Sequence, residues 1–259
     1  MPVLELKDAE IYYELSGLEQ ETVLVLSNSL GTNLAMWEPQ MPALSQAFRI
    51  LRYDTRGHGR SSVSPGPYTI EQLANEVLAL LDKLRIERVH FCGLSMGGMI
   101  GMSLAVRVSH RLRKLILCNT APKIGSPEVW NTRIDTVRKN GMKAVADGVL
   151  ERWFTPAFRA ASPSAIESTK QMLLTTPVEG YAASCAAVRD MDARDSISSI
   201  RVPTLIIGGT HDPVTPPHDG HFMAERIAGA GYQELPAAHL SNIEASAAFT
   251  MAVSSFLRG

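Results

Sequence analysis

Short apolar segments alternate with longer amphipathic ones along most of this chain, and this alternation constrains the fold more than any other feature of the sequence. Each apolar segment is bounded by turn residues, which is typical of strands buried on both faces of a parallel sheet. Strands that alternate with helices in this way predict an α/β fold, with a mostly parallel sheet covered by helices on both sides. The apolar segments are residues 23–26, 50–53, 88–92, 114–118 and 204–207.

Further strands are predicted at both ends of the chain. Residues 3–15 alternate apolar and polar side chains and predict two strands joined at residues 7–9, while residues 232–235 predict a last short strand. The clearest helix covers residues 70–84, whose apolar side chains share one face, with Thr69 at the N-cap position.

One stretch interrupts the alternation. Residues 121–192 contain no convincing strand, only helical patterns separated by prolines and a glycine, and three or four helices fit there. The strand pattern then resumes at residues 202–207. We therefore expect residues 1–120 and 193–259 to form one α/β core, with residues 121–192 as a helical cap inserted between two of its strands.

Composition excludes several functional classes. The formal net charge of -1 comes without a basic or acidic block, which argues against nucleic acid or an anionic membrane surface as a partner. The first residues lack the pattern of a signal peptide, and no apolar run approaches the roughly 20 residues that cross a bilayer. Cys92 and Cys118 lie in apolar runs and, with Cys185, show no metal-ligand spacing. We expect a reduced, cytoplasmic protein without a metal or cofactor.

Residues 93–97 carry the strongest chemical signal. Gly93, Ser95 and Gly97 match the pattern Gly-x-Ser-x-Gly, and the match lies between a predicted strand and a predicted helix. This setting is that of a nucleophile elbow, in which a strained turn exposes the serine hydroxyl at the positive end of a helix. The alternative is a chance match in a glycine-containing turn, and the flanking strand and helix favour Ser95 as a nucleophile.

A serine nucleophile needs a base, and the base needs an acid that orients it. With an elbow of this kind the chain order is serine, acid and histidine, each at the carboxyl end of a strand. Asp212 follows the strand at residues 204–207, and His239 follows the last predicted strand. We therefore predict Ser95, Asp212 and His239 as a catalytic triad.

Two other polar positions compete for the acid. Asp54 follows a strand but precedes the nucleophile, and we expect its charge to pair with Arg56 and to organise the loop that also contains His58. Asn119 follows the strand after the elbow, where some relatives of this architecture place the acid, but an amide cannot be an anionic partner.

An oxyanion hole would complete the set, because the charge that develops on a carbonyl oxygen is bound by two backbone N–H groups. Met96, directly after the nucleophile, is predicted to supply one of them. The loop at residues 27–31 is predicted to supply the other, with Leu30 as the donor and Gly31 allowing a close approach.

Together these residues resemble the α/β-hydrolase superfamily over essentially the whole chain, and more narrowly its 3-oxoadipate enol-lactonase family. Most relatives carry His-Gly in the loop after the first parallel strand, where this chain has Asn28 and Ser29, and that departure is a feature of the lactonase group. The arginine–glycine loop and the elbow occur in many α/β-hydrolases and discriminate little. The stretches that carry the resemblance are residues 27–32, 36–37, 53–59, 93–98 and 238–244.

The resemblance implies an eight-stranded, mostly parallel sheet flanked by helices, with a helical cap between core strands. It also implies the reaction: Ser95 would open 3-oxoadipate enol-lactone to 3-oxoadipate through an acyl-enzyme, in the β-ketoadipate pathway of bacterial aromatic catabolism. Some enzymes of this group are fused to a decarboxylase, and the chain ends at Gly259 without room for that partner.

The implied substrate is a small lactone with a free carboxylate, so the pocket should offer a cation, for which an arginine fork suits better than lysine. We predict Arg133, which shares an amphipathic stretch with Trp130. Trp130, Trp153 and Ser29 are predicted as further substrate-binding residues, and Phe154 as part of an apolar wall. Further candidates for the cation among the basic residues of the cap are Arg138, Lys139, Lys143 and Arg152.

Other functions share these motifs. A general carboxylesterase, a carbon–carbon hydrolase or a cofactor-free perhydrolase would use the same triad, while a haloalkane dehalogenase would need a carboxylate in place of Ser95. From another class, a ligand receptor can reuse the fold without fast turnover, since fold does not imply function. The sequence leaves the oligomeric state open, with a homo-oligomer among the alternatives.

Overall fold

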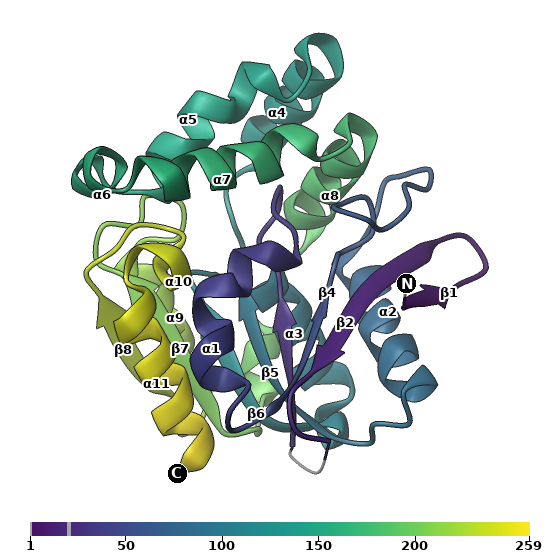
Figure 1. Cartoon of the computed structure of the whole chain (residues 1–259), viewed down its shortest axis with the longest axis vertical. Helices are drawn as coiled ribbons and strands as arrows, with labels where there is room; N and C mark the ends of the chain where they lie inside the picture. The colour runs from purple at the N-terminus through teal and green to yellow at the C-terminus, as the bar shows by residue number, and fades with distance from the viewer. Residues whose placement is uncertain (1, 20–21) are drawn as a thin grey trace.

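The computed structural model describes residues 2–19 and 22–259. Within these residues, eight strands form one sheet in the order β1-β2-β4-β3-β5-β6-β7-β8 (Figure 1). β2 pairs antiparallel with β1 and with β4, and all other neighbours are parallel. This confirms the predicted α/β fold and its mostly parallel sheet. The strands are β1 (Val3–Glu5), β2 (Glu10–Ser16), β3 (Val23–Ser27), β4 (Arg49–Tyr53), β5 (Val89–Leu94), β6 (Leu112–Cys118), β7 (Thr204–Gly209) and β8 (Gly231–Leu235).

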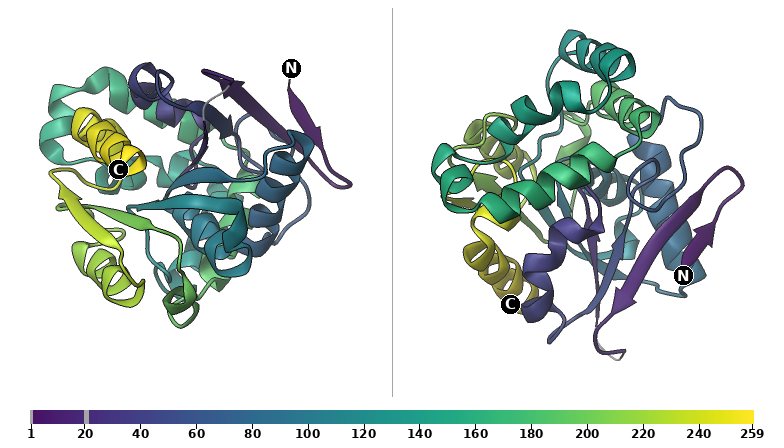
Figure 2. Two further views of the ribbon diagram at one scale, coloured as in Figure 1. Left: turned by 90° about the horizontal axis from the view of Figure 1, so that it is seen from below. Right: turned by 45° about the horizontal axis from the view of Figure 1, so that its top comes forward.

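Helices cover both faces of the sheet (Figure 2). α2 packs against α3 on one face, and α1 packs against α11 on the other. The predicted cap of α2 is confirmed, because the Thr69 hydroxyl accepts a hydrogen bond from the Gln72 N–H at 3.0 Å. The helices outside the segment between β6 and β7 are α1 (Met41–Leu44), α2 (Ile70–Lys83), α3 (Met96–Arg107), α9 (Pro217–Arg226), α10 (Ser241–Glu244) and α11 (Ser246–Arg258). The 3₁₀ turns are η1 (Leu34–Gln40), η2 (Ser109–Arg111) and, shortly before β7, η3 (Ser196–Ser199).

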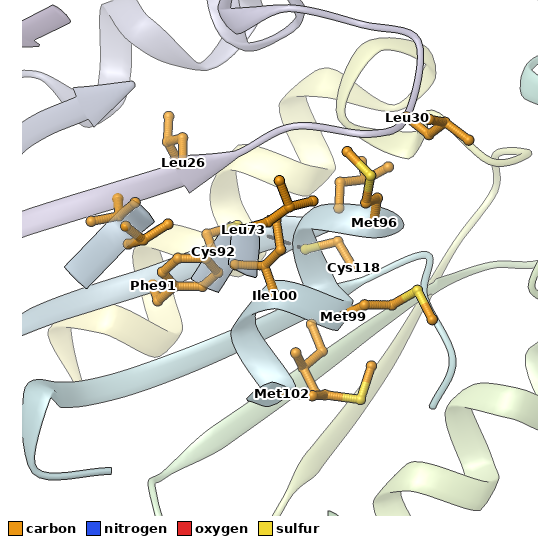
Figure 3. Close-up of a cluster of buried hydrophobic side chains, with 14 of the residues drawn as sticks. Leu26, Leu30, Leu73, Phe91, Cys92, Met96, Met99, Ile100, Met102 and Cys118 are labelled. Carbon is orange, nitrogen blue, oxygen red and sulfur yellow. Dashed lines mark hydrogen bonds between the residues drawn. The ribbon is translucent and has the colours of Figure 1, made fainter. Parts of the chain in front are cut away.

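The core lies between the sheet and these helices. Every residue of β3, β5 and β7 is buried, and apart from Ser27, His90 and Thr204 these strands consist of apolar residues and glycine. Cys92 on β5 and Cys118 on β6 are buried as predicted, with their sulfur atoms 3.7 Å apart (Figure 3). Cys185 is also buried and free.

The segment between β6 and β7 is entirely helical and lies over the carboxyl ends of the parallel strands (Figure 1). The prediction of three or four helices was wrong: the described residues form five there. Pro127, Pro156 and Pro163 each begin a helix, because the first helical position needs no N–H donor and suits the fixed φ of proline. The five are α4 (Pro127–Asn140), α5 (Lys143–Trp153), α6 (Pro156–Ala161), α7 (Pro163–Thr175) and α8 (Val178–Asp190).

Close contacts hold this helical layer to the sheet. The Ala193 N–H donates to Pro122 O at 2.9 Å, which joins the two chain segments where the layer leaves and re-enters the core. On α8, a Cβ on Gly180 would lie 2.6 Å from the Cα of Gly57. α8 therefore rests directly on the loop after β4. No helix within the described residues is long and apolar enough to span a membrane.

Candidate active site

Ser95 lies at the turn between β5 and α3 in a backbone conformation that few residues adopt. Its φ is 55° and its ψ is −113°, and a non-glycine residue held in a sparsely populated region costs about 1 to 3 kcal/mol. The turn is fixed because the Ser95 N–H donates to Cys118 O at 2.9 Å and the Thr120 hydroxyl donates to Ser95 O at 2.8 Å. A strained turn at the end of a buried strand is the elbow geometry that the motif predicts.

The two glycines around Ser95 are required by close backbone contacts. A Cβ on Gly93 would lie 2.1 Å from Gly97 O, so the turn can close only without a side chain there. A Cβ on Gly97 would lie 2.1 Å from Ser27 O. The first turn of α3 therefore packs on the end of β3, and this contact brings the loop after β3 next to Ser95.

Asp212 and His239 meet at the carboxyl ends of β7 and β8. His239 Nδ1 donates to Asp212 Oδ2 at 2.8 Å, and both residues are buried. Asp212 Oδ1 accepts from the N–H groups of Val214 and Thr215 at 2.8 and 3.1 Å, and its Oδ2 accepts from the Thr215 hydroxyl at 2.8 Å. Burial alone would raise the pKa of Asp212, but the charge of His239 and these hydrogen bonds outweigh it and hold the pKa below its ordinary value.

Asn119 supports this pair from the end of β6. Its amide donates to Asp212 Oδ2 and to Ala238 O, both at 3.1 Å, and its oxygen accepts from the Ser241 hydroxyl at 2.5 Å. Asn119 adopts a φ of 42°, a region that asparagine tolerates better than most residues. Asn119 cannot be the anionic partner of His239, as its amide predicts, and it is instead a hydrogen-bond donor to the acid.

Two buried backbone N–H groups lie unused beside Ser95. Figure 3 shows Leu30 on the loop after β3 and Met96 at the start of α3. Neither N–H has a hydrogen-bond partner in the part of the chain that the structure describes, although nearly all buried N–H groups in folded proteins are paired. Two unpaired donors at this point can bind an oxygen atom of a ligand.

The loop that carries Leu30 is held from beneath. The Asn28 amide donates to Tyr53 O at 2.7 Å, and its oxygen accepts from the indole N–H of Trp37 at 2.9 Å. The Gly31 N–H donates to His58 Nε2 at 3.0 Å, and His58 Nδ1 donates to Arg56 O at 3.1 Å. Asn28 thus fixes the loop that carries Leu30.

A cavity of about 200 Å³ opens over Ser95 and His239, between the sheet and the helices α4, α5 and α8. Its walls are mostly apolar, which suits a small organic ligand. All four predicted substrate-binding residues line it, namely Ser29, Trp130, Arg133 and Trp153, and so does Leu30. Phe154 was wrongly predicted as a wall residue: it is absent from the lining and stacks instead on Phe158, with ring centroids 5.3 Å apart.

Two arginines line this cavity, Arg133 from α4 and Arg152 from α5. Neither has a carboxylate partner among the described residues, and the Arg133 guanidinium lies 5.1 Å from the centroid of the Trp130 ring. Burial and the nearby charge of Arg133 lower the pKa of Arg152. Burial also raises the pKa of the adjoining Tyr181 phenol, which stays a neutral donor. Two uncompensated cations side by side favour an anionic ligand.

The expected pair of Asp54 and Arg56 does not form. Asp54 instead accepts from the N–H groups of Leu34 and Arg60, both at 2.8 Å. Arg56 pairs with Glu76 at 2.5 Å and Asp8 at 2.7 Å, because its side chain extends toward α2 while Asp54 closes two backbone turns. Both residues organise the loop, but through separate partners.

Sequence reasoning missed or passed over four residues that the structure brings to the site. Asn119 and Thr215 were recognisable only as polar residues near strand ends, and Tyr181 carried no signal beyond its place in a helix. Arg152 was among the basic residues of the cap, without a feature that distinguished it. Ser95 and His239 line the same cavity, and Asp212 is hydrogen-bonded to His239. The residues that the structure describes contain no cluster of metal-ligating side chains.

Comparison with known proteins identifies the family of this chain. Residues 22–246 match the family model of the alpha/beta hydrolase fold. The chain is 40% identical over 264 residues to 3-oxoadipate enol-lactonase 2 of Acinetobacter baylyi, with 100% of this chain and 99% of that protein covered.

Solved structures agree closely. The enol-lactonase from Burkholderia xenovorans LB400 superposes with a TM-score of 0.98 at 48% identity, covering 100% of both chains. A thermophilic esterase from Thermogutta terrifontis, solved with malate bound, superposes with a TM-score of 0.94 at 29% identity, covering 100% of this chain and 98% of that chain.

Proposed function

The chain belongs to the α/β-hydrolase fold family and is a hydrolase, and from this premise we propose that it opens 3-oxoadipate enol-lactone to 3-oxoadipate. The observation that carries the proposal is the cavity over Ser95 and His239, whose mostly apolar wall contains two arginines without a carboxylate partner among the described residues. The enol-lactone is a small cyclic ester with one free carboxylate, so it matches both parts of this cavity. Relatives of that name support the choice.

In this proposal Arg133 and Arg152 bind the carboxylate of the lactone, with the Tyr181 hydroxyl as a further donor. Guanidinium groups bind carboxylates through two parallel hydrogen bonds, which fix orientation as well as position. Trp130 and Trp153 then enclose the ring, and Ser29 lies at its edge.

The first chemical step is attack by Ser95. His239 Nε2 accepts the proton of the Ser95 hydroxyl as its oxygen bonds to the lactone carbonyl carbon. Asp212, held ionised by its hydrogen bonds, keeps His239 Nδ1 protonated and stabilises the imidazolium that forms. The elbow presents the serine at the N-terminus of α3, where the partial positive charge favours the developing anion.

The oxyanion of this intermediate would bind to the free N–H groups of Leu30 and Met96, a contribution of about 3 kcal/mol per donor in comparable enzymes. When the intermediate collapses, the ring C–O bond breaks, His239 returns its proton and the acyl-enzyme remains. The leaving enol tautomerises to a ketone, which makes ring opening close to irreversible. Water activated by His239 then releases 3-oxoadipate and restores Ser95.

We further propose that residues 1–120 and 193–259 act as the catalytic core and residues 121–192 as a cap that selects the substrate. Residues of α4, α5 and α8 line the cavity over Ser95, which supports this division. A cytoplasmic location in the β-ketoadipate pathway goes with this proposal, and three free buried cysteines fit a reducing compartment.

The direct test follows the loss of enol-lactone absorbance on addition of the purified protein. We expect the wild type to consume the lactone and to release 3-oxoadipate. Ser95→Ala should show no turnover above background. Hydrolysis of p-nitrophenyl acetate serves as the parallel assay for a general esterase. If the protein cleaved this ester rapidly but left the lactone unopened, the proposed substrate would be wrong.

A further inference from the structure

The peptide groups on both sides of His239 are held by residues that link this loop to the cap. The Ala238 N–H, which precedes the histidine, donates to the Glu244 carboxylate at 2.9 Å. The Leu240 N–H, which follows it, donates to Trp153 O at 3.0 Å. Trp153 ends α5 of the cap, so the second of these hydrogen bonds crosses directly from the cap to the loop.

Glu244 connects the Ala238 N–H to the cap as well. Its carboxylate also accepts from the Thr155 N–H, at 3.2 and 3.3 Å for its two oxygens, and from the Thr155 hydroxyl. Thr155 stands between α5 and α6 and caps the N-terminus of α6. Both N–H groups around His239 are therefore connected to one short piece of the cap, residues 153–155.

We propose that Glu244 and Thr155 are positioning residues for His239. The side chain of His239 has a strong partner only at Nδ1, so the place of its Nε2 depends on the backbone of a loop between β8 and α10. Such loops are mobile unless their backbone is bound, and charge-assisted hydrogen bonds to a carboxylate bind it firmly. A displacement of the base by about 1 Å is enough to cost roughly 100-fold in rate.

Neither Glu244 nor Thr155 lines the cavity, which separates this role from substrate binding. The inference rests on the proposed function only in taking Ser95 and His239 as the hydrolytic pair. It requires the cap to control the turnover of every ester, including a neutral one that has no carboxylate for Arg133 and Arg152 to bind. A cap that merely encloses the substrate would control only the carboxylated lactone.

The experiment compares Thr155→Val, Thr155→Ser and Glu244→Gln in the full-length protein. Thr155→Val removes the hydroxyl donor, Thr155→Ser keeps it, and Glu244→Gln removes the carboxylate while leaving the α6 cap in place. The matched control is Thr175→Val, an exposed cap threonine whose hydroxyl bonds only within α7. Steady-state kinetics gives kcat and KM for p-nitrophenyl acetate and for the enol-lactone. A separate measurement gives the rate at which diisopropyl fluorophosphate labels Ser95.

We expect Thr155→Val and Glu244→Gln to lower kcat for p-nitrophenyl acetate and the labelling rate by roughly 10-fold, with KM nearly unchanged. Thr155→Ser should restore most of the rate, and Thr175→Val should match the wild type. Thr155→Val and Glu244→Gln break the same link between the cap and the His239 loop. The double variant should therefore be no slower than the slower of the two single variants.

The inference would be overturned if Thr155→Val and Glu244→Gln kept the wild-type kcat and labelling rate and changed only the KM for the lactone. Multiplicative losses in the double variant would also overturn it. A wild type that leaves the lactone unopened would contradict the proposed substrate instead, and the ester and labelling rates would still decide the role of Glu244 and Thr155.

Discussion

The amide of Asn119 binds the Asp212 carboxylate at 3.1 Å and, at the same distance, the carbonyl of Ala238, the residue before His239. One side chain at the end of β6 thus contacts the acid at the end of β7 and the loop of the base after β8. Asn119 is itself oriented by the Ser241 hydroxyl, which donates to its oxygen. The amide has to be a donor on both sides, so a carboxylate in its place would be repelled twice.

We therefore expect Asn119→Asp to lower kcat/KM for hydrolysis by about 100-fold near neutral pH. The new carboxylate would lie beside Asp212, and like charges at that distance raise the pKa of the pair. The acidic limb of the pH–rate profile should move to higher pH as a result. Aspartate tolerates the positive φ of this position nearly as well as asparagine, so backbone strain is a small part of the effect.

Asn242→Asp is the matched control for this change. Asn242 is a buried asparagine that donates to Met36 O at 2.8 Å and contacts neither Asp212 nor His239. It should lose stability without a shift in the acidic limb. An Asn119→Asp profile that superposes on that of the wild type would show that Asn119 does not control the charge of Asp212.

The two cavity arginines should control which esters are cleaved. Arg133→Ala and Arg152→Ala are each expected to lower kcat/KM for the carboxylated lactone by roughly 10- to 100-fold, the range for a lost hydrogen bond between charged groups. Hydrolysis of p-nitrophenyl acetate, which has no carboxylate, should change by less than about 3-fold. Steady-state kinetics on both substrates gives the comparison.

Arg138→Ala tests whether the effect belongs to the cavity or to the charge of the cap. Arg138 lies on α4 like Arg133, but it is exposed and pairs with Glu179 at 3.0 Å. It should leave both activities unchanged. Equal losses on lactone and neutral ester in the cavity variants would contradict a role in carboxylate binding.

The contact between α3 and β3 should tolerate no side chain at Gly97. Because a Cβ there would lie 2.1 Å from Ser27 O, we expect Gly97→Ala to lower the free energy of unfolding by about 3 kcal/mol and to abolish hydrolysis by moving the Leu30 loop. Gly148→Ala is the control, since on α5 its Cβ would meet only the end of the Arg152 side chain at 3.7 Å. That variant should gain up to about 1 kcal/mol. Urea unfolding measures both, and a Gly97→Ala protein of unchanged stability would contradict the tight contact.

The strands and the residues around Ser95 could be predicted because their signals are local. A buried parallel strand is a continuous apolar run, and the elbow needs glycines at fixed spacing around its serine. The positions of Asp212 and His239 then follow from chain order. Geometry alone shows how Asp212 is held, because its donor Asn119 comes from a strand far away in sequence.

Local sequence signals could not predict which residues the charged side chains bind. Asp54 and Arg56 are two residues apart and of opposite charge, yet they do not pair. Asp54 accepts from two backbone N–H groups, and Arg56 pairs with Glu76 on α2. The same holds for Arg152. The basic residues of the cap look alike in sequence, and only the packing of α4 against α5 brings Arg133 and Arg152 to one cavity wall.

His58 should make the protein sensitive to acid. It is fully buried and accepts the Gly31 N–H at Nε2, and burial lowers its pKa from 6.5 to about 4. Between these two values the unfolded chain binds a proton that the folded protein does not, so stability falls as the pH decreases from 6.5 toward 4 and is fully present above 6.5. From pH 7 to pH 5 this one group should remove about 2 kcal/mol of the free energy of unfolding.

Urea unfolding of the wild type, His58→Gln and His110→Gln at pH 7 and pH 5 checks this expectation. Glutamine does not titrate, and its side-chain oxygen is still an acceptor for the Gly31 N–H, so His58→Gln should lose about 2 kcal/mol less than the wild type between the two pH values. His110 is exposed in the 3₁₀ turn η2, and its replacement should leave the pH dependence as it is. The comparison uses the difference between the two pH values, so any constant loss of stability in His58→Gln cancels. Parallel losses in all three proteins would mean that His58 takes up its proton equally well in the folded and unfolded chain.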